Sequence, residues 1–429
     1  MASPPAARSG PSPLVPLAYL TCAASAFLAA ALGIGWLAPD LASHYYQPRV
    51  LALTHTVTLG WITLAIMGAS YQLIPIVLER PVWSERLARW QLGVLAVAVL
   101  GMIAHFYLGT WPELAAAAGL LAVGIGLYLL NVGLSLRGFT RWTFTARMAM
   151  LGYGGLALTM LFGLALATNR VRPFLPGEFF PTLHAHVHLA LLGWVTPMIF
   201  GVTARVYPMF LLAPMPGRWP CRLQLWGLAV GLPSVELGLV GVRGLLVPGA
   251  LAVAVAAGSH AWWVLAAVRG RKRPGLDWGL RFALTATGFL LPAAMLGGSL
   301  AADLLSRPRV AVAYAVIVLG GWVSLTIAGM MLKIVPFLVW HRAFAPRAGR
   351  ERVPTLANLS WPWVEGTAYA LLTGGVALLA VAALVGEVTA IRVAAAVLAL
   401  GALAFSLVLV RILGHLSPRF QKTPAALVA

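Results

Sequence analysis

Histidines are the residues of this chain best suited to chemistry, and three of the nine stand together. His184, His186 and His188 alternate in the segment His-Ala-His-Val-His. Residues four apart share a helix face, so His184 and His188 point the same way, whereas His186 lies roughly 200° round a regular helix. One helix is therefore expected to offer a two-histidine face and a single histidine directed elsewhere.

An internal repeat links His55 to this cluster. Gly-Trp-x-Thr/Ser, a second glycine and a proline recur with constant spacing at 60–75, 193–208 and 321–336, and the offsets between the first glycines are 193 − 60 = 133 and 321 − 193 = 128 residues. A histidine stands five residues before the first glycine in two copies, as His55 and His188, and Val316 takes that place in the third. A long fixed period indicates a repeated structural unit, here with pseudo-symmetry.

Imidazole is a common protein ligand of haem iron and also suits copper and non-haem iron. Two histidines at matching depth on different helices could face each other across a haem. We therefore predict His55 with His188 or His184 as haem ligands, and His184, His186, His188 and His105 as candidate metal ligands. The alternative is that these histidines lie at the headgroup boundary and bond to water. The sequence assigns no catalytic residue.

The composition is that of a membrane protein. The chain is 61% hydrophobic and 10% charged, which a soluble protein cannot bury. Its net charge of +19 comes from basic residues in short loops between apolar runs, so it indicates membrane topology rather than nucleic-acid binding. Two cysteines, Cys22 and Cys221, are too few for a disulfide framework or a thiolate metal site.

Spans of about 20 apolar residues predict an all-α protein with twelve membrane helices. They run approximately over 13–38, 50–78, 90–110, 113–136, 147–168, 183–212, 224–243, 246–268, 278–303, 310–340, 365–386 and 389–414. The three motifs fall in helices 2, 6 and 10, so the repeat is four helices long (13–136, 147–268 and 278–414). We expect one membrane domain over 13–414, flanked by cytoplasmic tails at 1–12 and 415–429.

The basic residues predict the orientation. Twenty-one lie in the termini and in the loops after the even-numbered helices up to helix 10, and seven lie on the opposite side. The positive-inside rule then places both termini in the cytoplasm of a bacterium or archaeon and the helix 2 and helix 6 histidines near the outer face. Within the spans, Arg205 and Lys333 either snorkel or pair with an acid such as Glu236. The repeated glycines are expected to allow close helix packing.

These features resemble subunit I of the haem-copper oxidase and nitric oxide reductase superfamily. The likeness lies in twelve helices in three pseudo-repeats, in histidines on helices 2 and 6, and in the segment Ile-Met-Gly-Ala-Ser-Tyr-Gln-Leu-Ile-Pro at 66–75, which is similar to helix 2 of the nitric oxide reductase catalytic subunit. The resemblance implies that His55 is an axial ligand of haem b. It also implies that a helix 6 histidine, His184, His186 or His188, ligates copper or non-haem iron.

The chain departs from the family pattern on two helices. The family needs metal-ligating histidines on helix 7 and haem-ligating histidines on helix 10, but 224–243 contains no histidine and helix 10 has none before His341. The resemblance therefore implies a divergent member without a complete binuclear centre, which retains a rearranged haem site on helices 2 and 6 or a mononuclear metal site.

The expected function is haem binding in the membrane, with a role in electron transfer or an accessory or sensing role in respiration or nitric oxide metabolism. A quinol or a separate cytochrome would be the redox partner, and an enzymatic activity, if present, would be that of an oxidoreductase related to terminal oxidases or nitric oxide reductases. Two alternatives remain open: a copper or haem transport or assembly protein, and a transporter without a prosthetic group whose path is lined by Glu236, Arg205 and Lys333.

Overall fold

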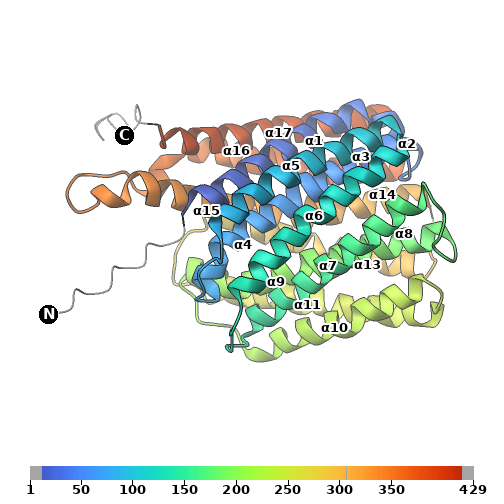
Figure 1. The fold of residues 1–429 in the computed structure, drawn as a ribbon. Coiled ribbons are helices and arrows are strands. Elements are labelled where there is room, and N and C mark those ends of the chain that lie inside the picture. The colour runs from blue at the N-terminus through green and yellow to red at the C-terminus, as the bar shows by residue number, and fades with distance from the viewer. Residues whose placement is uncertain (1–11, 306, 418–429) are drawn as a thin grey trace.

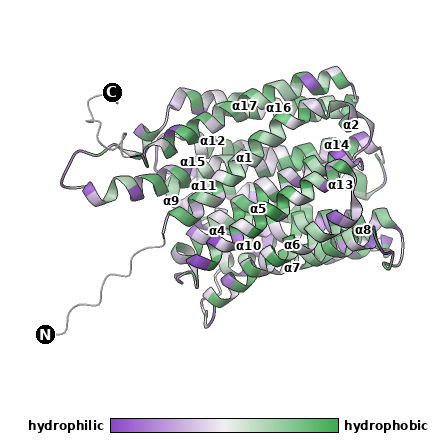
Figure 2. Ribbon diagram, turned by 45° about the horizontal axis from the view of Figure 1, so that its top comes forward, coloured by the Kyte–Doolittle hydropathy of each residue, from purple (hydrophilic) through white to green (hydrophobic). Residues whose placement is uncertain are grey.

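The computed structural model describes residues 12–305 and 307–417. These residues form an all-helical bundle whose long segments run side by side, with apolar residues along their middle and polar residues toward the two ends (Figures 1 and 2). The predicted fold class is confirmed. The expected tails at 1–12 and 415–429 lie almost entirely outside the described residues.

The long helices follow the predicted repeats of four. The first repeat contains α1 (Leu14–Trp36), the short α2 (Ala38–Ser43), the continuous segment α3, η1 and α4 (Pro48–His55, Thr56–Thr63 and Leu64–Val77), α5 (Glu85–Leu108) and α6 (Trp111–Ser135). The second contains α7 (Phe144–Asn169), the segment α8, η2 and α9 (Phe179–His188, Leu189–Val195 and Thr196–Leu211), α10 (Arg218–Leu239), the short η3 (Arg243–Leu245) and α11 (Leu246–Arg269).

The third repeat begins with α12 (Trp278–Gly288) and α13 (Leu290–Ala301), which together make one span. It continues with the segment α14, η4 and α15 (Pro308–Ala315, Val316–Ser324 and Leu325–Ala343), the short η5 (Ala345–Arg347) and η6 (Leu356–Leu359), α16 (Pro362–Val385) and α17 (Val388–Gly414). The last helix packs against α1, so the bundle is closed.

Eleven helical segments among the described residues are long and apolar enough to cross a membrane. The one predicted span that is not among these eleven is the seventh along the chain, at 224–243. It forms a helix of 22 residues, α10, that begins earlier, at Arg218. It falls short of the apolarity of the others because Arg218, Arg222 and Glu236 lie within it. The twelve predicted helices are all present, and α10 is the most polar of them.

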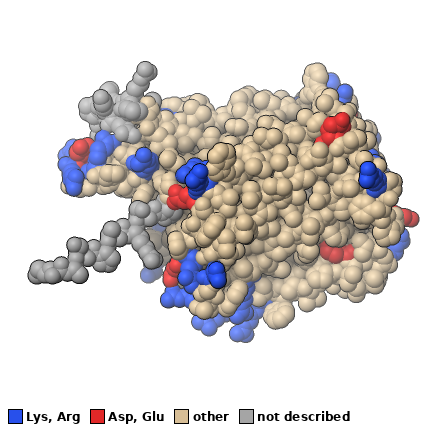
Figure 3. Space-filling view, in the orientation of Figure 1, with Lys and Arg blue, Asp and Glu red and all other residues tan. Residues whose placement is uncertain are grey.

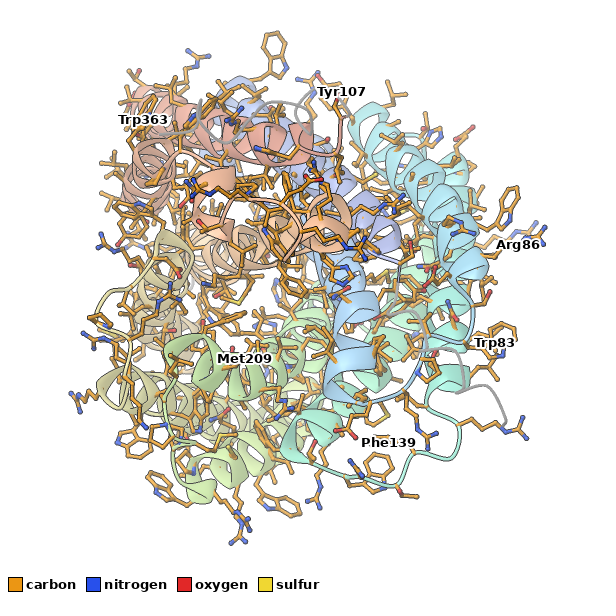
Figure 4. The ribbon with its side chains drawn as sticks, turned by 90° about the vertical axis from the view of Figure 1, so that its left-hand side faces the viewer. Trp83, Arg86, Tyr107, Phe139, Met209 and Trp363 are labelled. Carbon is orange, nitrogen blue, oxygen red and sulfur yellow. The ribbon has the colours of Figure 1, made fainter. Side chains whose placement is uncertain are left out.

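The three motif helices, which we define as α3–η1–α4, α8–η2–α9 and α14–η4–α15, form the centre of the bundle. In their most apolar windows 56%, 78% and 67% of the residues are buried, compared with 28–44% in the other spans. The motif tryptophans Trp61, Trp194 and Trp322 are all buried. Tryptophans at the ends of outer helices behave differently: Trp83 and Trp363 are exposed and point away from the bundle (Figure 4), as expected at a membrane interface.

The repeated glycines are packing positions, as the sequence predicted. A Cβ atom on the second motif glycine would lie 2.6 Å from Tyr19 Cβ at Gly68 and 2.8 Å from Met148 Cβ at Gly201. At the equivalent Gly329 it would lie 2.9 Å from the Cβ atom of a phenylalanine on α12. In every repeat the motif helix therefore contacts the first helix of its own repeat, with no room for a side chain.

The motif helices are not regular, which the sequence did not reveal. Each changes from α-helical to π-helical hydrogen bonding four or five residues before its first motif glycine, in η1, η2 and η4. The hydroxyl groups of Thr196 and Ser324 donate to carbonyl oxygens five residues earlier, at 2.8 Å and 2.6 Å. Widened π turns within α-helices occur often at functional sites. Here they begin directly after His55 and His188.

One hydrogen bond joins the first and third motif helices at the centre. Trp61 Nε1 donates to Ser324 Oγ at 2.9 Å, and both residues are buried. We expect Ser324→Ala to leave the indole N–H without a partner and to lower the free energy of unfolding by about 1–3 kcal/mol. Thermal unfolding in detergent measures this. Ser299→Ala, which removes an exposed hydroxyl bonded only to its own helix, is the control and should leave the midpoint unchanged.

Candidate haem and metal site

A large cavity opens among α2, α3, α8 and α14, which lie on the right in Figure 1, and extends to the π-helical segments η2 and η4 in the middle of the bundle. Its volume is about 840 Å³, which falls within the range of roughly 300–1,000 Å³ of small-molecule and cofactor sites. Its walls are mostly apolar, with a few polar groups. The histidines that line it are His44, His55, His184, His186 and His188.

Two of these histidines are held in the same way. The Nδ1 atom of His55 lies 2.8 Å from the carbonyl oxygen of Leu51, and that of His188 lies 2.8 Å from the carbonyl oxygen of His184. A carbonyl can only accept, so each Nδ1 carries the proton and each Nε2 keeps its lone pair. This tautomer is the one that a histidine needs in order to bind a metal through Nε2.

Aromatic rings fix the orientation of both imidazoles. His55 stacks on Phe106 of α5, with ring centroids 4.4 Å apart and planes 24° apart. His188 lies nearly parallel to Tyr314 of α14, with centroids 6.3 Å apart and planes 22° apart. Stacking and the Nδ1 hydrogen bonds together limit ring rotation, so both side chains are positioned before any ligand binds.

His184 and His186 have different surroundings. The Nε2 atom of His184 bonds to the hydroxyl group of Tyr45 at 3.1 Å. Burial raises the pKa of the Tyr45 phenol, so the phenol stays protonated at neutral pH and occupies the nitrogen that would otherwise face a metal. His186 packs against α7, where a Cβ atom on Gly163 would lie 3.0 Å from its Cε1 atom. Its Nδ1 atom is buried and has no hydrogen-bond partner.

The structure thus brings four predicted histidines, His55, His184, His186 and His188, to one cavity. It does not bring His105 there, because that ring bonds through Nδ1 to Thr110 at 2.8 Å at the end of α5. Within the described ranges no group of three or more His, Cys, Asp or Glu side chains is arranged to hold a metal ion. The donor set therefore fits a haem, which needs one or two axial imidazoles, better than a mononuclear copper or iron site, which needs more protein ligands.

Aromatic residues that the sequence analysis did not select close the outer end of the cavity. His44 stacks on Tyr45 at 4.4 Å, and the guanidinium of Arg170 lies over the rings of Tyr46, Trp111 and Phe179 at 5.7, 4.4 and 5.3 Å. All of these side chains line the cavity. A signal was available in the loop segment His-Tyr-Tyr at 44–46, which precedes the first motif helix.

Among the described residues no ion pair joins Glu236 to Arg205 or Lys333. Lys333 pairs with Asp277, with Nζ 2.6 Å from Oδ2, and not with Glu236. The sequence analysis did not select Asp277 as a partner of Lys333, because Asp277 lies in the loop before α12. There its Oδ1 atom caps the helix by accepting from the backbone N–H of Leu280. Arg205 is exposed, and Glu236 has a buried oxygen without a partner.

The basic residues gather mainly at the opposite end of the bundle from the cavity. In Figure 3 the lysines and arginines are concentrated on the left, where α1 begins and α17 ends, and only a few lie on the right. The histidine cavity therefore lies at the end of the molecule that carries the smaller number of basic residues.

Part of the chain is similar in sequence to a curated protein. The chain is similar to quinol oxidase subunit 1 of Sulfolobus acidocaldarius, with 29% identity over 151 residues. The match covers 32% of this chain and 29% of that relative. No model of a known protein family matches the chain. The similarity thus covers about a third of the chain, and the described residues have an all-helical, multi-span fold.

Proposed function

We propose that this protein binds haem b in the membrane at the histidine cavity and takes part in electron transfer, or has an accessory or sensing role, in respiration or nitric oxide metabolism. The observation that carries the proposal is that His55 of α3 and the three histidines of α8 line one large apolar cavity. His55 has its proton fixed on Nδ1 by the carbonyl oxygen of Leu51, which leaves its Nε2 lone pair for a metal.

In this proposal His55 supplies one axial ligand and a histidine of α8 supplies the other, with His188 and His184 as the candidates from sequence. Bound haem would supply one-electron redox chemistry. The residues of the chain would fix the imidazole rings, exclude water from the apolar walls and present Arg170 at the mouth of the cavity as a positive charge. A positive group there favours the anionic carboxylates of a haem over a neutral ligand.

The proposal does not extend to a complete binuclear centre. Helix α10, which corresponds to the seventh predicted span, contains no histidine. On α14, in the tenth predicted span, the residue that faces His188 is Tyr314. We therefore do not assign oxygen or nitric oxide reduction. Because the matched relative is named as a quinol oxidase subunit, we propose a quinol as electron donor, with a separate cytochrome as the alternative. By the positive-inside rule, the protein lies in a cytoplasmic membrane with both termini inside.

The absorption spectrum and metal content of the purified protein test this function. We expect sharp bands in the reduced form and iron in proportion to protein. Copper in stoichiometric amount without haem would support a role in copper transport or assembly instead. A colourless, metal-free preparation from haem-replete cells would contradict haem binding and leave a transporter as the remaining hypothesis.

A further inference from the structure

The internal repeat relates not only single residues but pairs of facing residues around the cavity. The position five residues before the first motif glycine is His55, His188 or Val316. The position seven residues before it (60 − 7 = 53, 193 − 7 = 186 and 321 − 7 = 314) is Leu53, His186 or Tyr314. All six side chains line the same cavity. If the geometry of one facing pair is observed at one interface between repeats, the repeat shows which residues face each other at the other two interfaces.

That known pair is His188 and Tyr314. In the second repeat, His188 stands five residues before the first motif glycine, and in the third repeat Tyr314 stands seven residues before it. The two rings lie nearly parallel, with centroids 6.3 Å apart. The same relation between the first and second repeats pairs His55 with His186. Both side chains line the same cavity, His55 from α3 and His186 from α8.

The surroundings of His186 suit a ligand. Its ring packs against Gly163 of α7, where a Cβ atom would lie 3.0 Å from Cε1, and its Nδ1 atom is buried. Contact with α7 therefore limits rotation of this imidazole before any metal binds. His55, on α3, lines the same cavity, and its Nδ1 atom is held by the carbonyl oxygen of Leu51.

The geometry of α8 separates His186 from His188. The helix is regular up to His188, as shown by the hydrogen bond from the His188 ring to the carbonyl of His184 four residues earlier. Residues two apart on such a helix point to nearly opposite sides. His186 packs against α7, so His188 faces the other way, toward Tyr314 on α14.

We propose that His55 and His186 are the two protein ligands of one six-coordinate haem, and that His188, which faces Tyr314 in another part of the same cavity, is not a ligand of that haem. This inference rests on the proposed function and chooses its second ligand. The repeat also predicts unequal sites: two imidazoles at the first interface, one imidazole and a phenol at the second, and the apolar pair Leu53 and Val316 at the third. Only the first interface has two facing imidazoles.

The test compares His186→Ala with His188→Ala and His184→Ala in the purified, haem-loaded protein by optical and electron paramagnetic resonance spectroscopy. We expect His186→Ala to convert the low-spin signal of a bis-histidine haem to a high-spin, five-coordinate signal that binds carbon monoxide when reduced. Added imidazole should restore the low-spin signal in His186→Gly. The other two variants should keep the wild-type signal.

The outcomes separate the two proposals. If His188→Ala or His184→Ala loses the low-spin signal while His186→Ala keeps it, haem binding stands but the pairing is wrong. If the His186 variants fail to fold, His188→Ala and His184→Ala together decide the same question: conversion of either to high spin would overturn the pairing, and an unchanged signal in both would support it. A wild-type protein without haem would overturn both the proposed function and this inference.

Discussion

Replacing His55 with alanine is expected to lower the haem content of the purified protein more than roughly tenfold, because even loss of an outer-shell partner costs about 10–100-fold in metal affinity. His55 is the candidate ligand with the most complete support, since its tautomer is fixed by Leu51 and its ring by Phe106. Haem per protein, measured as the pyridine haemochrome, gives the result directly.

His105→Ala is the matched control for this experiment. His105 lies on α5 near the same end of the bundle, but its ring bonds to Thr110 and does not line the cavity. Its variant should retain the full haem content. Equal haem in wild type and His55→Ala would show that His55 is not a ligand, even if the protein binds haem elsewhere.

Gly155→Ala is expected to have the largest effect on folding. A Cβ atom at this position of α7 would lie 2.0 Å from the carbonyl oxygen of Gly193 in η2, so the backbones must move apart. Overpacking of a well-packed interior costs about 1–3 kcal/mol, and more where only backbone can give way. We expect a lower unfolding temperature and poor yield of monodisperse protein.

Gly154→Ala provides the control, because nothing lies within 4 Å of a Cβ atom at the adjacent position. This variant should unfold at the wild-type temperature or slightly above it, since alanine favours a helix over glycine. If the two variants were equally stable, the close contact between α7 and η2 would not exist as described.

The helices and the repeat could be predicted from sequence because they depend on signals that are local and periodic. Apolar runs of spanning length fix the helices, and the Gly-Trp-x-Thr/Ser motif fixes the register of the repeats. The role of Gly68, Gly201 and Gly329 in packing also followed, since small residues at constant spacing have a direct physical meaning in membrane helices. The polar character of α10 was underestimated because its first turn was read as loop.

The π-helical segments could not be predicted, because the change from i→i−4 to i→i−5 hydrogen bonding leaves hydropathy unchanged. The only trace in the sequence is the hydroxyl residue at the end of the motif, as in Thr196 and Ser324, which donates to the carbonyl oxygen five residues earlier. The contribution of Tyr314 was also missed. It stands at the register position of His186, but a tyrosine in an apolar helix gives no signal of its own until the two repeats are placed face to face.

Density in the cavity, from a cryo-electron microscopy map of the protein purified from haem-replete cells, tests the central claim most directly. We predict a flat macrocycle whose iron lies within bonding distance of His55 Nε2 and of a histidine Nε2 from α8. A cavity that holds only lipid or water, with the imidazoles of α3 and α8 free of any metal, would contradict the account.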